Sequence, residues 1–363
     1  MFQKTKYYSL DKILKANAQY NMIIGERSNG KTYSTLEYAV KKWVERGEQT
    51  AIVRRWAEDL RGKRAQTIFS SLVSNGFISD ITGGQWNGVY YYAGRWYLMA
   101  TDGDKKVVDS EPFAFAFAIA SQEHDKSTSY PNITTIIFDE FISRTSYLPD
   151  EFVLFMNVIS TIVRDRKNVK IFMLGNTVNK YCPYFNEMGL KHIKQMKQGT
   201  IDVYRYGQSG LSVAVEYTKP NAKGKASDLY FAFDNPKLSM ITGGGWEIGI
   251  YPHCPVKYKP RDIKFTYFVQ FDGDILQCEI VKIDGQYFTF VHKKTTPIKN
   301  PEKDLIFTPE YSYFRNYRTK ITKPFDDVGK MIAGFFMRDK VFYQDNETGE
   351  IMRNYLLWCN KQN

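Results

Sequence analysis

Four short apolar segments in the first half of the chain predict buried strands. Residues 21–24, 51–53, 134–138 and 169–174 are mostly apolar, and 134–138 is rich in β-branched residues. Short runs of this kind are typical of parallel strands that are covered on both faces.

Helical periodicity occurs between these strands. Leu36, Ala39 and Val40 recur at helical spacing within 31–45, and Gly47 is expected to end that helix. A second helix is predicted over 150–164. Strands that alternate with helices indicate a doubly wound α/β domain with a largely parallel sheet.

The segment between 83 and 120 is rich in Gly, Tyr and Trp. This composition predicts strands and hairpins at 85–92 and 95–100, and the alternation of Phe and Ala over 113–117 predicts another strand.

After about residue 200 the pattern changes. Residues 200–250 are polar and Gly-rich, which suits a small connector, and a meander of three strands is predicted at 265–271, 275–283 and 286–292. Helices are expected at 325–338 and at the C-terminus. The predicted domains are a nucleotide-binding domain over 1–199, a connector over 200–250, and a smaller α+β domain over 251–363.

Composition and charge narrow the class of protein. The formal net charge is +11, which favours a polyanionic partner but does not identify one. The sequence contains neither an apolar run of about 18 residues nor a signal-peptide pattern, so we expect no membrane segment and a cytoplasmic location. The cysteines lie far apart, which supports neither a disulfide framework nor a metal site.

The segment Gly25–Thr32 fits the phosphate-loop pattern G-x-x-x-x-G-K-[ST] without a mismatch. It follows a predicted strand and opens a predicted helix, as the mechanism requires, because backbone N–H groups and the helix N-terminus then face the phosphates. The residues expected to hold ATP are Gly25, Arg27, Ser28, Asn29, Gly30, Lys31 and Thr32. Lys31 would neutralise the β- and γ-phosphates, and the Thr32 hydroxyl would bind Mg²⁺.

Asp139 and Glu140 follow the apolar segment 134–138. Ligands collect at the carboxyl ends of parallel strands, so this pair is expected beside the phosphate loop. Asp139 would bind Mg²⁺, and Glu140 would polarise the attacking water. The separation between Gly25 and Asp139 leaves room for an inserted strand, as in the additional-strand class of P-loop ATPases.

Several polar and cationic residues are candidate helpers. Asn176, after the fourth strand, either contacts the γ-phosphate or closes a turn. Arg164 and Arg166 either face a neighbouring subunit's nucleotide or interact with a helix C-terminus. Lys126 is a second candidate cation acting in trans.

Arg61, Lys63 and Arg64 are predicted to lie in a loop after the second strand. They either contact a DNA backbone or form a solvated charged surface.

The chain resembles the DNA-packaging ATPases (encapsidation proteins) of small, short-tailed bacteriophages. The resemblance is carried by residues 22–31 (MIIGERSNGK), 47–55 (GEQTAIVRR), 126–141 (KSTSYPNITTIIFDEF) and 164–176. It is specific over most of 10–180 and weak beyond about residue 200.

That resemblance implies a homopentameric ring at the portal of an empty prohead, in the host cytoplasm, which drives double-stranded DNA inward. In some relatives a structural RNA tethers the ring. It also implies that Arg164 is a trans arginine finger, that Lys126 acts in trans, and that Asp139 and Glu140 perform the Walker B roles.

The family's C-terminal domain is similar to a ribonuclease-H-type nuclease that has lost its catalytic acids and binds nucleic acid. Asp272, Asp274 and Asp284 fall at turns between predicted strands, so we expect a domain that does not cleave.

Three other functions fit the phosphate loop. A ring-forming helicase or nucleic-acid remodelling ATPase would use the same core, and a strand-displacement assay would identify it. A small-molecule kinase is disfavoured by the pair Asp139 and Glu140. A non-enzymatic nucleic-acid-binding protein with a relic loop is disfavoured by the intact Lys31 and Thr32.

Overall fold

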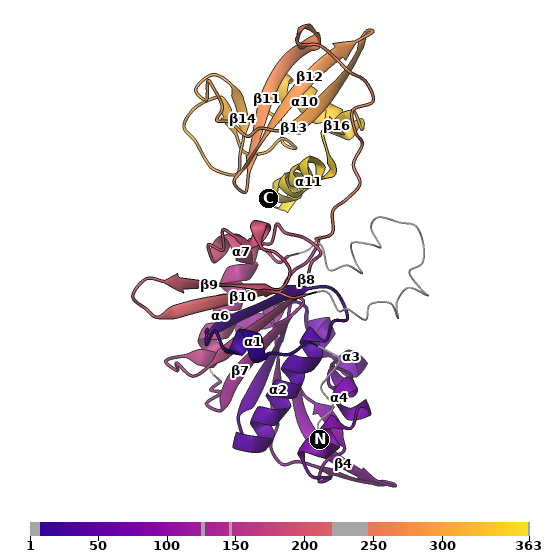
Figure 1. The fold of residues 1–363 in the computed structure, drawn as a ribbon, viewed down its shortest axis with the longest axis vertical. Helices are drawn as coiled ribbons and strands as arrows, with labels where there is room; N and C mark the ends of the chain where they lie inside the picture. Colours follow the sequence, from indigo (N-terminus) through magenta and orange to yellow (C-terminus); the bar gives the residue numbers. More distant parts are fainter. Residues whose placement is uncertain (1–7, 125–127, 145–146, 220–245, 362–363) are drawn as a thin grey trace. The chain divides into compact units, whose positions relative to one another are not determined.

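The computed structural model describes residues 8–124, 128–144, 147–219 and 246–361. The chain divides into two compact units, Met1–Glu247 and Ile248–Asn363. Each unit has its own sheet (Figure 1).

The first unit is built on one sheet of ten strands, counted over the described residues. The strands are β1 (Tyr20–Gly25), β2 (Gln49–Arg54), β3 (Gly88–Tyr92), β4 (Arg95–Asp102), β5 (Lys105–Val108), β6 (Ala114–Ala118), β7 (Ile133–Asp139), β8 (Lys170–Asn176), β9 (Thr200–Tyr206) and β10 (Leu211–Tyr217).

The centre of this sheet is parallel. The order is β3-β4-β6-β2-β7-β8-β1-β10-β9, with β5 paired to β4. All neighbours from β6 to β10 in this order pair in parallel, and antiparallel hairpins complete both sides. The strand that lies between β1 and β7 in space is β8, which follows both in sequence, whereas β2, which lies between them in sequence, pairs with the other side of β7.

Helices cover both faces of this sheet. Successive side chains of a strand point to opposite faces, so a strand of consecutive apolar residues needs packing partners on both. Met22 and Ile136 pack with Phe155 of one helix, whereas the adjacent Ile23 packs with Leu36 of another. The helical segments of the unit are α1 (Asp11–Leu14), α2 (Lys31–Arg46), η1 (Ala57–Leu60), α3 (Gly62–Gln66), α4 (Ser70–Ser74), α5 (Phe77–Ile81), η2 (Ile119–His124), α6 (Glu151–Val163), α7 (Pro183–Glu187) and η3 (Ile193–Gln195).

The predicted central strands, the two helices and the fold class are confirmed. The loop predicted around Arg61, Lys63 and Arg64 is wrong, because Arg61 caps α3 and the other two lie within it. The predicted domain boundary at residue 200 is also wrong. Strands β9 and β10 belong to the first sheet, where β10 pairs in parallel with β1. Of the predicted connector, residues 220–245 lie outside the described residues.

The second unit begins at Ile248, close to the predicted boundary at 251. Its sheet has the order β15-β14-β11-β12-β13-β16. The predicted antiparallel meander is confirmed as β11–β12–β13, and α11 packs against it. The elements are η5 (Pro260–Asp262), β11 (Ile263–Phe271), β12 (Asp274–Ile283), β13 (Gln286–Lys293), β14 (Leu305–Phe307), β15 (Tyr317–Arg318), α10 (Asp327–Met337), β16 (Val341–Tyr343) and α11 (Asn346–Lys361).

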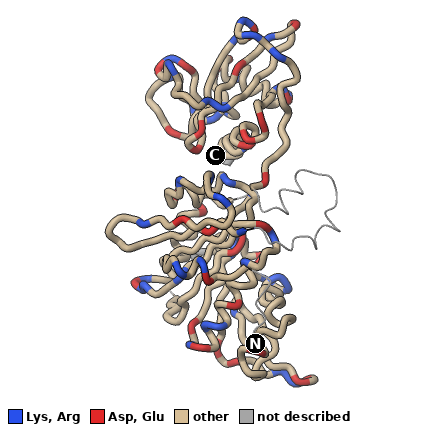
Figure 2. Tube along the Cα trace, in the orientation of Figure 1, with Lys and Arg blue, Asp and Glu red and all other residues tan. Residues whose placement is uncertain are grey.

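Within the described ranges, the structure contains no helix that is both long enough and apolar enough to cross a bilayer. Figure 2 shows that basic positions occur in both units and are interspersed with acidic ones. The net positive charge therefore does not by itself identify one nucleic-acid-binding face.

Candidate nucleotide-binding site

The candidate site lies where three parallel strands end. Gly25 ends β1, Asn176 ends β8 and Asp139 ends β7. Gly25 is directly opposite Asn176 in the sheet, and Asp139 is opposite Leu174. This register brings together groups that lie more than a hundred residues apart in sequence.

The phosphate loop has a compact conformation that its sequence explains. Gly30 has a φ of 95° and Ser28 a φ of 60°, so the loop turns through left-handed positions before α2 begins at Lys31. At Gly25 a Cβ atom would lie 1.9 Å from Oγ1 of the buried Thr218. Asn29 donates its amide to the same Thr218 hydroxyl at 2.9 Å, which fixes the loop against the end of β10.

The ammonium group of Lys31 is buried inside this loop. It donates to the carbonyl oxygens of Gly25 and Glu26 at 3.3 and 2.6 Å, and to the amide oxygens of Asn29 and Asn176, both at 3.2 Å. Burial lowers the pKa of Lys31 to about 8, although Asp139 and Glu26 act in the opposite direction. The Lys31 ammonium is thus partly dehydrated and is positioned to bind a polyanion.

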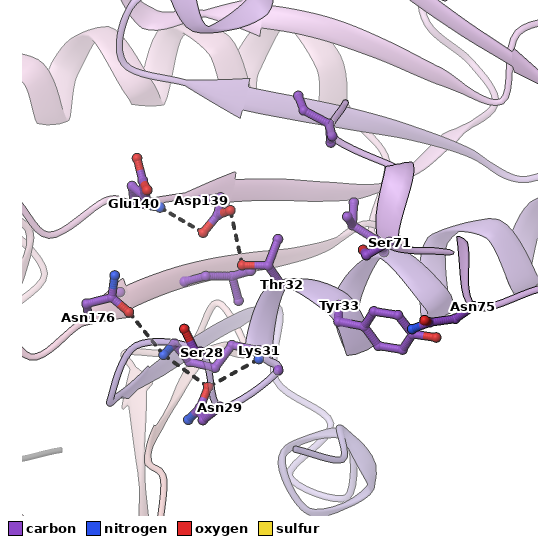
Figure 3. Close-up of a pocket in the computed structure, with 15 residues that line it drawn as sticks. Ser28, Asn29, Lys31, Thr32, Tyr33, Ser71, Asn75, Asp139, Glu140 and Asn176 are labelled. Carbon is purple, nitrogen blue, oxygen red and sulfur yellow. Dashed lines mark hydrogen bonds between the residues drawn. The ribbon is translucent and has the colours of Figure 1, made fainter. Parts of the chain in front are cut away.

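Thr32 and Asp139 form a pair of oxygen ligands. The Thr32 hydroxyl donates to Oδ2 of Asp139 at 3.2 Å (Figure 3). A hydroxyl and a carboxylate are ligands that Mg²⁺ prefers. The contact brings the end of β7 onto the first turn of α2.

Glu140 follows Asp139 in a left-handed conformation, with a φ of 62°. Its N–H donates to Oδ1 of Asp139 at 3.0 Å, and its side chain is 67% exposed. Arg54, at the end of β2, contacts both carboxylates. Its Nη2 lies 3.0 Å from Asp139 Oδ2, and its Nη1 lies 3.2 Å from Glu140 Oε2.

These residues line a cavity of about 390 Å³. Its phosphate-loop end is formed by residues 28–32, with Asp139, Glu140 and Asn176 beside them. Figure 3 shows Asn176 joined to Lys31 and Asp139 joined to Thr32 by hydrogen bonds. The volume is in the range typical of small-ligand sites. Sequence reasoning missed several lining residues, which are Tyr33, Leu36, Ile68, Ser71, Asn75, Leu174 and Gly175.

Other predicted residues lie outside this cavity. Arg27 is exposed, with its Nη2 3.9 Å from Glu247 Oε1. Arg164 is exposed just beyond α6 and donates to the carbonyl of Thr128 at 3.1 Å. Lys126 lies outside the described residues.

Arg166, the alternative to Arg164 as a trans-acting cation, makes its contacts within its own chain. Its guanidinium donates to four backbone carbonyls at 2.6–3.1 Å, those of Tyr130, Pro131, Ile133 and Ile162. This leaves Arg164 as the more accessible of the two cations.

The residues of α3 that were considered for DNA contact are exposed. Arg64 pairs with Asp59, with Nη1 and Oδ1 3.2 Å apart, so its charge is partly neutralised. Arg61 and Lys63 are solvent-facing.

Sequence reasoning also missed the roles of Arg54 and its neighbour Arg55. In the sequence, both residues could be identified only as members of a basic segment. The signal that identifies Arg54 is its position at the end of a strand adjacent to β7, where Val53 is opposite Phe138.

Comparison with known proteins gives concordant matches. A family model described as podovirus DNA encapsidation protein (Gp16) matches residues 2–240. The DNA packaging protein of Bacillus phage PZA is 29% identical over 273 residues, which is 74% of each chain. That of Bacillus phage B103 is 31% identical over 185 residues, which is 50% of each chain.

Two solved structures match the whole chain in fold. The bacteriophage phi-29 genome packaging motor assembly gives a TM-score of 0.56 at 20% identity, covering 99% of this chain and 100% of that one. The phi-28 gp11 DNA packaging motor gives 0.51 at 17% identity, covering 99% of both chains.

Proposed function

The chain belongs to the podovirus DNA encapsidation protein family, and from that premise we propose that it is a motor subunit that hydrolyses ATP to move double-stranded DNA into a viral prohead. One observation carries the proposal. Lys31 and Thr32 of the phosphate loop lie in the same cavity as Asp139 and Glu140. A triphosphate on the loop is therefore within reach of both carboxylates.

ATP with Mg²⁺ fits this site. The loop provides the buried ammonium of Lys31 at the start of α2, and Thr32 and Asp139 are adjacent oxygen ligands that would hold the metal. When bound, Mg²⁺ neutralises charge that develops on the β- and γ-phosphates. Lys31 would bind the same phosphates and add a second positive charge.

Hydrolysis then depends on positioning of the attacking water. Glu140 is suited to polarise this water, because it is next to the metal ligand but mostly exposed to the cavity. Asn176 already contacts Lys31 and is close enough to report the presence of a γ-phosphate.

A neighbouring subunit is expected to complete the site. Arg164 is the proposed trans cation, since it is exposed and contacts only a backbone carbonyl among the interactions described above. Lys126 is kept as a second candidate on the basis of the family resemblance. A ring, a pentamer by the same resemblance, would place each Arg164 at the next site.

The other partners follow from the motor function. Double-stranded DNA is the substrate that is moved, the portal of the prohead is the docking partner, and a structural RNA is a partner in some relatives. The exposed residues Arg61, which precedes α3, and Lys63, within it, are candidate DNA contacts, together with Arg64.

The second unit is proposed to bind nucleic acid without cleaving it. Asp274 begins β12 and Asp284 follows its end, about 30 Å away along an extended strand of this length. Asp274 also pairs with Lys293, with Oδ1 and Nζ 2.8 Å apart. These acids therefore do not converge as two-metal cleavage requires.

The test is ATP hydrolysis and DNA packaging by purified protein with proheads. Lys31→Ala should abolish nucleotide binding, and Glu140→Gln should bind ATP but lower hydrolysis by about 10²–10⁴-fold. DNA protected from nuclease inside the prohead should fall in parallel.

Lys41→Ala and Glu45→Gln are matched controls. These exposed residues pair with each other on α2, outside the cavity, and both variants should package normally. Wild-type hydrolysis in both site variants would refute the ATPase proposal. Hydrolysis without packaging would refute the translocation proposal alone.

A further inference from the structure

Glu140 has a backbone conformation that needs support. A non-glycine residue with a φ of 62° is in a disfavoured conformation, which it keeps only when its surroundings impose it. The side chain of Glu140 is 67% exposed, so packing of the carboxylate does not provide the constraint. The Glu140 N–H donates to Asp139 Oδ1 at 3.0 Å and the Phe141 N–H to the Leu174 carbonyl at 3.2 Å, which leaves the carbonyl side of Glu140 to be fixed.

Arg55 fixes it. The Arg55 guanidinium donates to the carbonyl of Glu140 at 3.2 Å and to the carbonyl of Phe141 at 2.9 Å. It therefore binds the two peptide units that follow Glu140, and the first of these flanks the Glu140 Cα and helps to set the direction of its side chain. Arg54 is different, because it contacts the carboxylates themselves.

Arg55 is in turn oriented by Glu151, the first residue of α6. Nε and Nη2 of Arg55 donate to the two carboxylate oxygens of Glu151 at 2.7 and 2.9 Å. The Tyr147 ring lies 5.0 Å from the guanidinium carbon. The Arg55 and Glu151 side chains are 8% and 1% exposed, so this bidentate pair is almost fully removed from water.

The remaining lone pairs of Glu151 are also occupied. The Tyr184 hydroxyl donates to Oε1 at 2.9 Å, and the Leu148 N–H donates to Oε2 at 2.7 Å. A buried ion pair whose other hydrogen bonds are all made has one arrangement, which makes it a rigid support.

We propose that Arg55, oriented by Glu151, is a positioning residue that holds the backbone of Glu140 so that its carboxylate meets the attacking water. This inference rests on the proposed ATPase function. It assigns to Arg55 a role in the rate of hydrolysis and none in the binding of ATP.

The alternative is that the pair only stabilises the fold. A buried ion pair is weak evidence for stability, because desolvation offsets much of the attraction between its charges. The positioning role and the purely stabilising role predict different rates of ATP hydrolysis for folded Arg55→Lys protein.

Lysine keeps the charge, but its single nitrogen cannot reproduce the planar fork by which three separate nitrogens of Arg55 reach both Glu151 oxygens and both carbonyls. We expect Arg55→Lys to lower kcat by about 10–100-fold, the effect of a small displacement of a catalytic group. KM for ATP and the Kd of a non-hydrolysable analogue should stay within about twofold. Glu151→Gln should lower kcat in the same way but by a smaller factor. Because this substitution is isosteric, it serves as the test variant if Arg55→Lys does not fold.

A double-mutant cycle with Glu140→Gln separates the two roles. If Arg55 acts through Glu140, then Arg55→Lys should cause no further loss in the Glu140→Gln background, as measured by single-turnover hydrolysis. An undiminished additional loss would overturn the proposal, and so would a folded Arg55→Lys protein with wild-type kcat. A wild-type rate in Glu140→Gln would instead refute the proposed function.

Arg318→Lys provides a matched control. Arg318 makes a bidentate pair with Asp326 in the second unit, with distances of 2.9 and 2.5 Å. This variant should change thermal stability but leave kcat of basal hydrolysis unchanged.

Discussion

The nucleotide affinity of this protein should fall as pH rises through about 8. In the free protein, burial lowers the pKa of Lys31 to about 8 from an ordinary value of 10.5. Phosphates are bound by the charged form, because an ammonium neutralises them and a neutral amine does not. Raising the pH therefore removes the binding-competent form of the loop before any nucleotide arrives.

The magnitude follows from the charged fraction of Lys31. With a pKa of about 8, roughly nine tenths of the molecules carry the charge at pH 7 and roughly one tenth at pH 9. The Kd for a non-hydrolysable ATP analogue should rise about tenfold over this interval, which is about 1.4 kcal/mol.

The stability of the nucleotide-free protein should change in the opposite direction. Between pH 8 and pH 10.5 the unfolded state binds more protons at Lys31 than the folded state does, so this residue's contribution to the free energy of unfolding increases with pH.

The change of nucleotide affinity with pH is measured by equilibrium titration with a fluorescent ATP analogue at half-unit pH steps. Lys31→Arg keeps its charge throughout and should show a flat Kd between pH 7 and pH 9. A flat profile in the wild-type protein, or an equal slope in both proteins, would refute the assignment to Lys31.

Three further outcomes are expected. Thr32→Ala should raise the Mg²⁺ concentration needed for half-maximal hydrolysis by about tenfold or more, as a metal titration of the ATPase rate would show, since one oxygen ligand is lost. Gly25→Ala should lower the free energy of unfolding by more than about 2 kcal/mol, because its Cβ would lie 1.9 Å from Thr218 Oγ1. Adding Thr218→Ala should restore part of the lost free energy of unfolding, as calorimetry would show. Mixing inactive Arg164→Ala and Glu140→Gln subunits should restore some hydrolysis, whereas no gain over either alone would exclude Arg164 as a trans cation.

The parts of the fold that were predictable are those encoded locally. The phosphate loop is contiguous, and Asp139 and Glu140 directly follow an apolar strand, so their roles could be inferred without knowing the sheet. Helices α3, α4 and α5 are five residues each, which is too short for a periodic pattern to be recognised. They are stabilised instead by burial of side chains such as Phe69 and Leu72.

The parts that were missed depend on long-range register. Strand β10 contains the buried Val213 and Val215, but the polar edge strand β9 and an intervening turn obscured this pattern. Only its pairing with β1 assigns β10 to the first sheet. Likewise, Arg54 and Arg55 are adjacent in sequence, and their separate roles become visible only when β2 lies beside β7.

Helix α6 connects the two groups on which the proposals for hydrolysis depend. Its first residue, Glu151, orients Arg55 and so the backbone of Glu140, and Arg164 directly follows its last residue. The helix has 13 residues and is about 20 Å long. If Arg164 contacts a neighbour's nucleotide, as proposed, a shift of this helix would be passed to Glu140 through the Arg55–Glu151 ion pair. It follows that Glu151→Gln should weaken the dependence of one subunit's hydrolysis on its neighbour, whereas Glu140→Gln removes the hydrolysis itself.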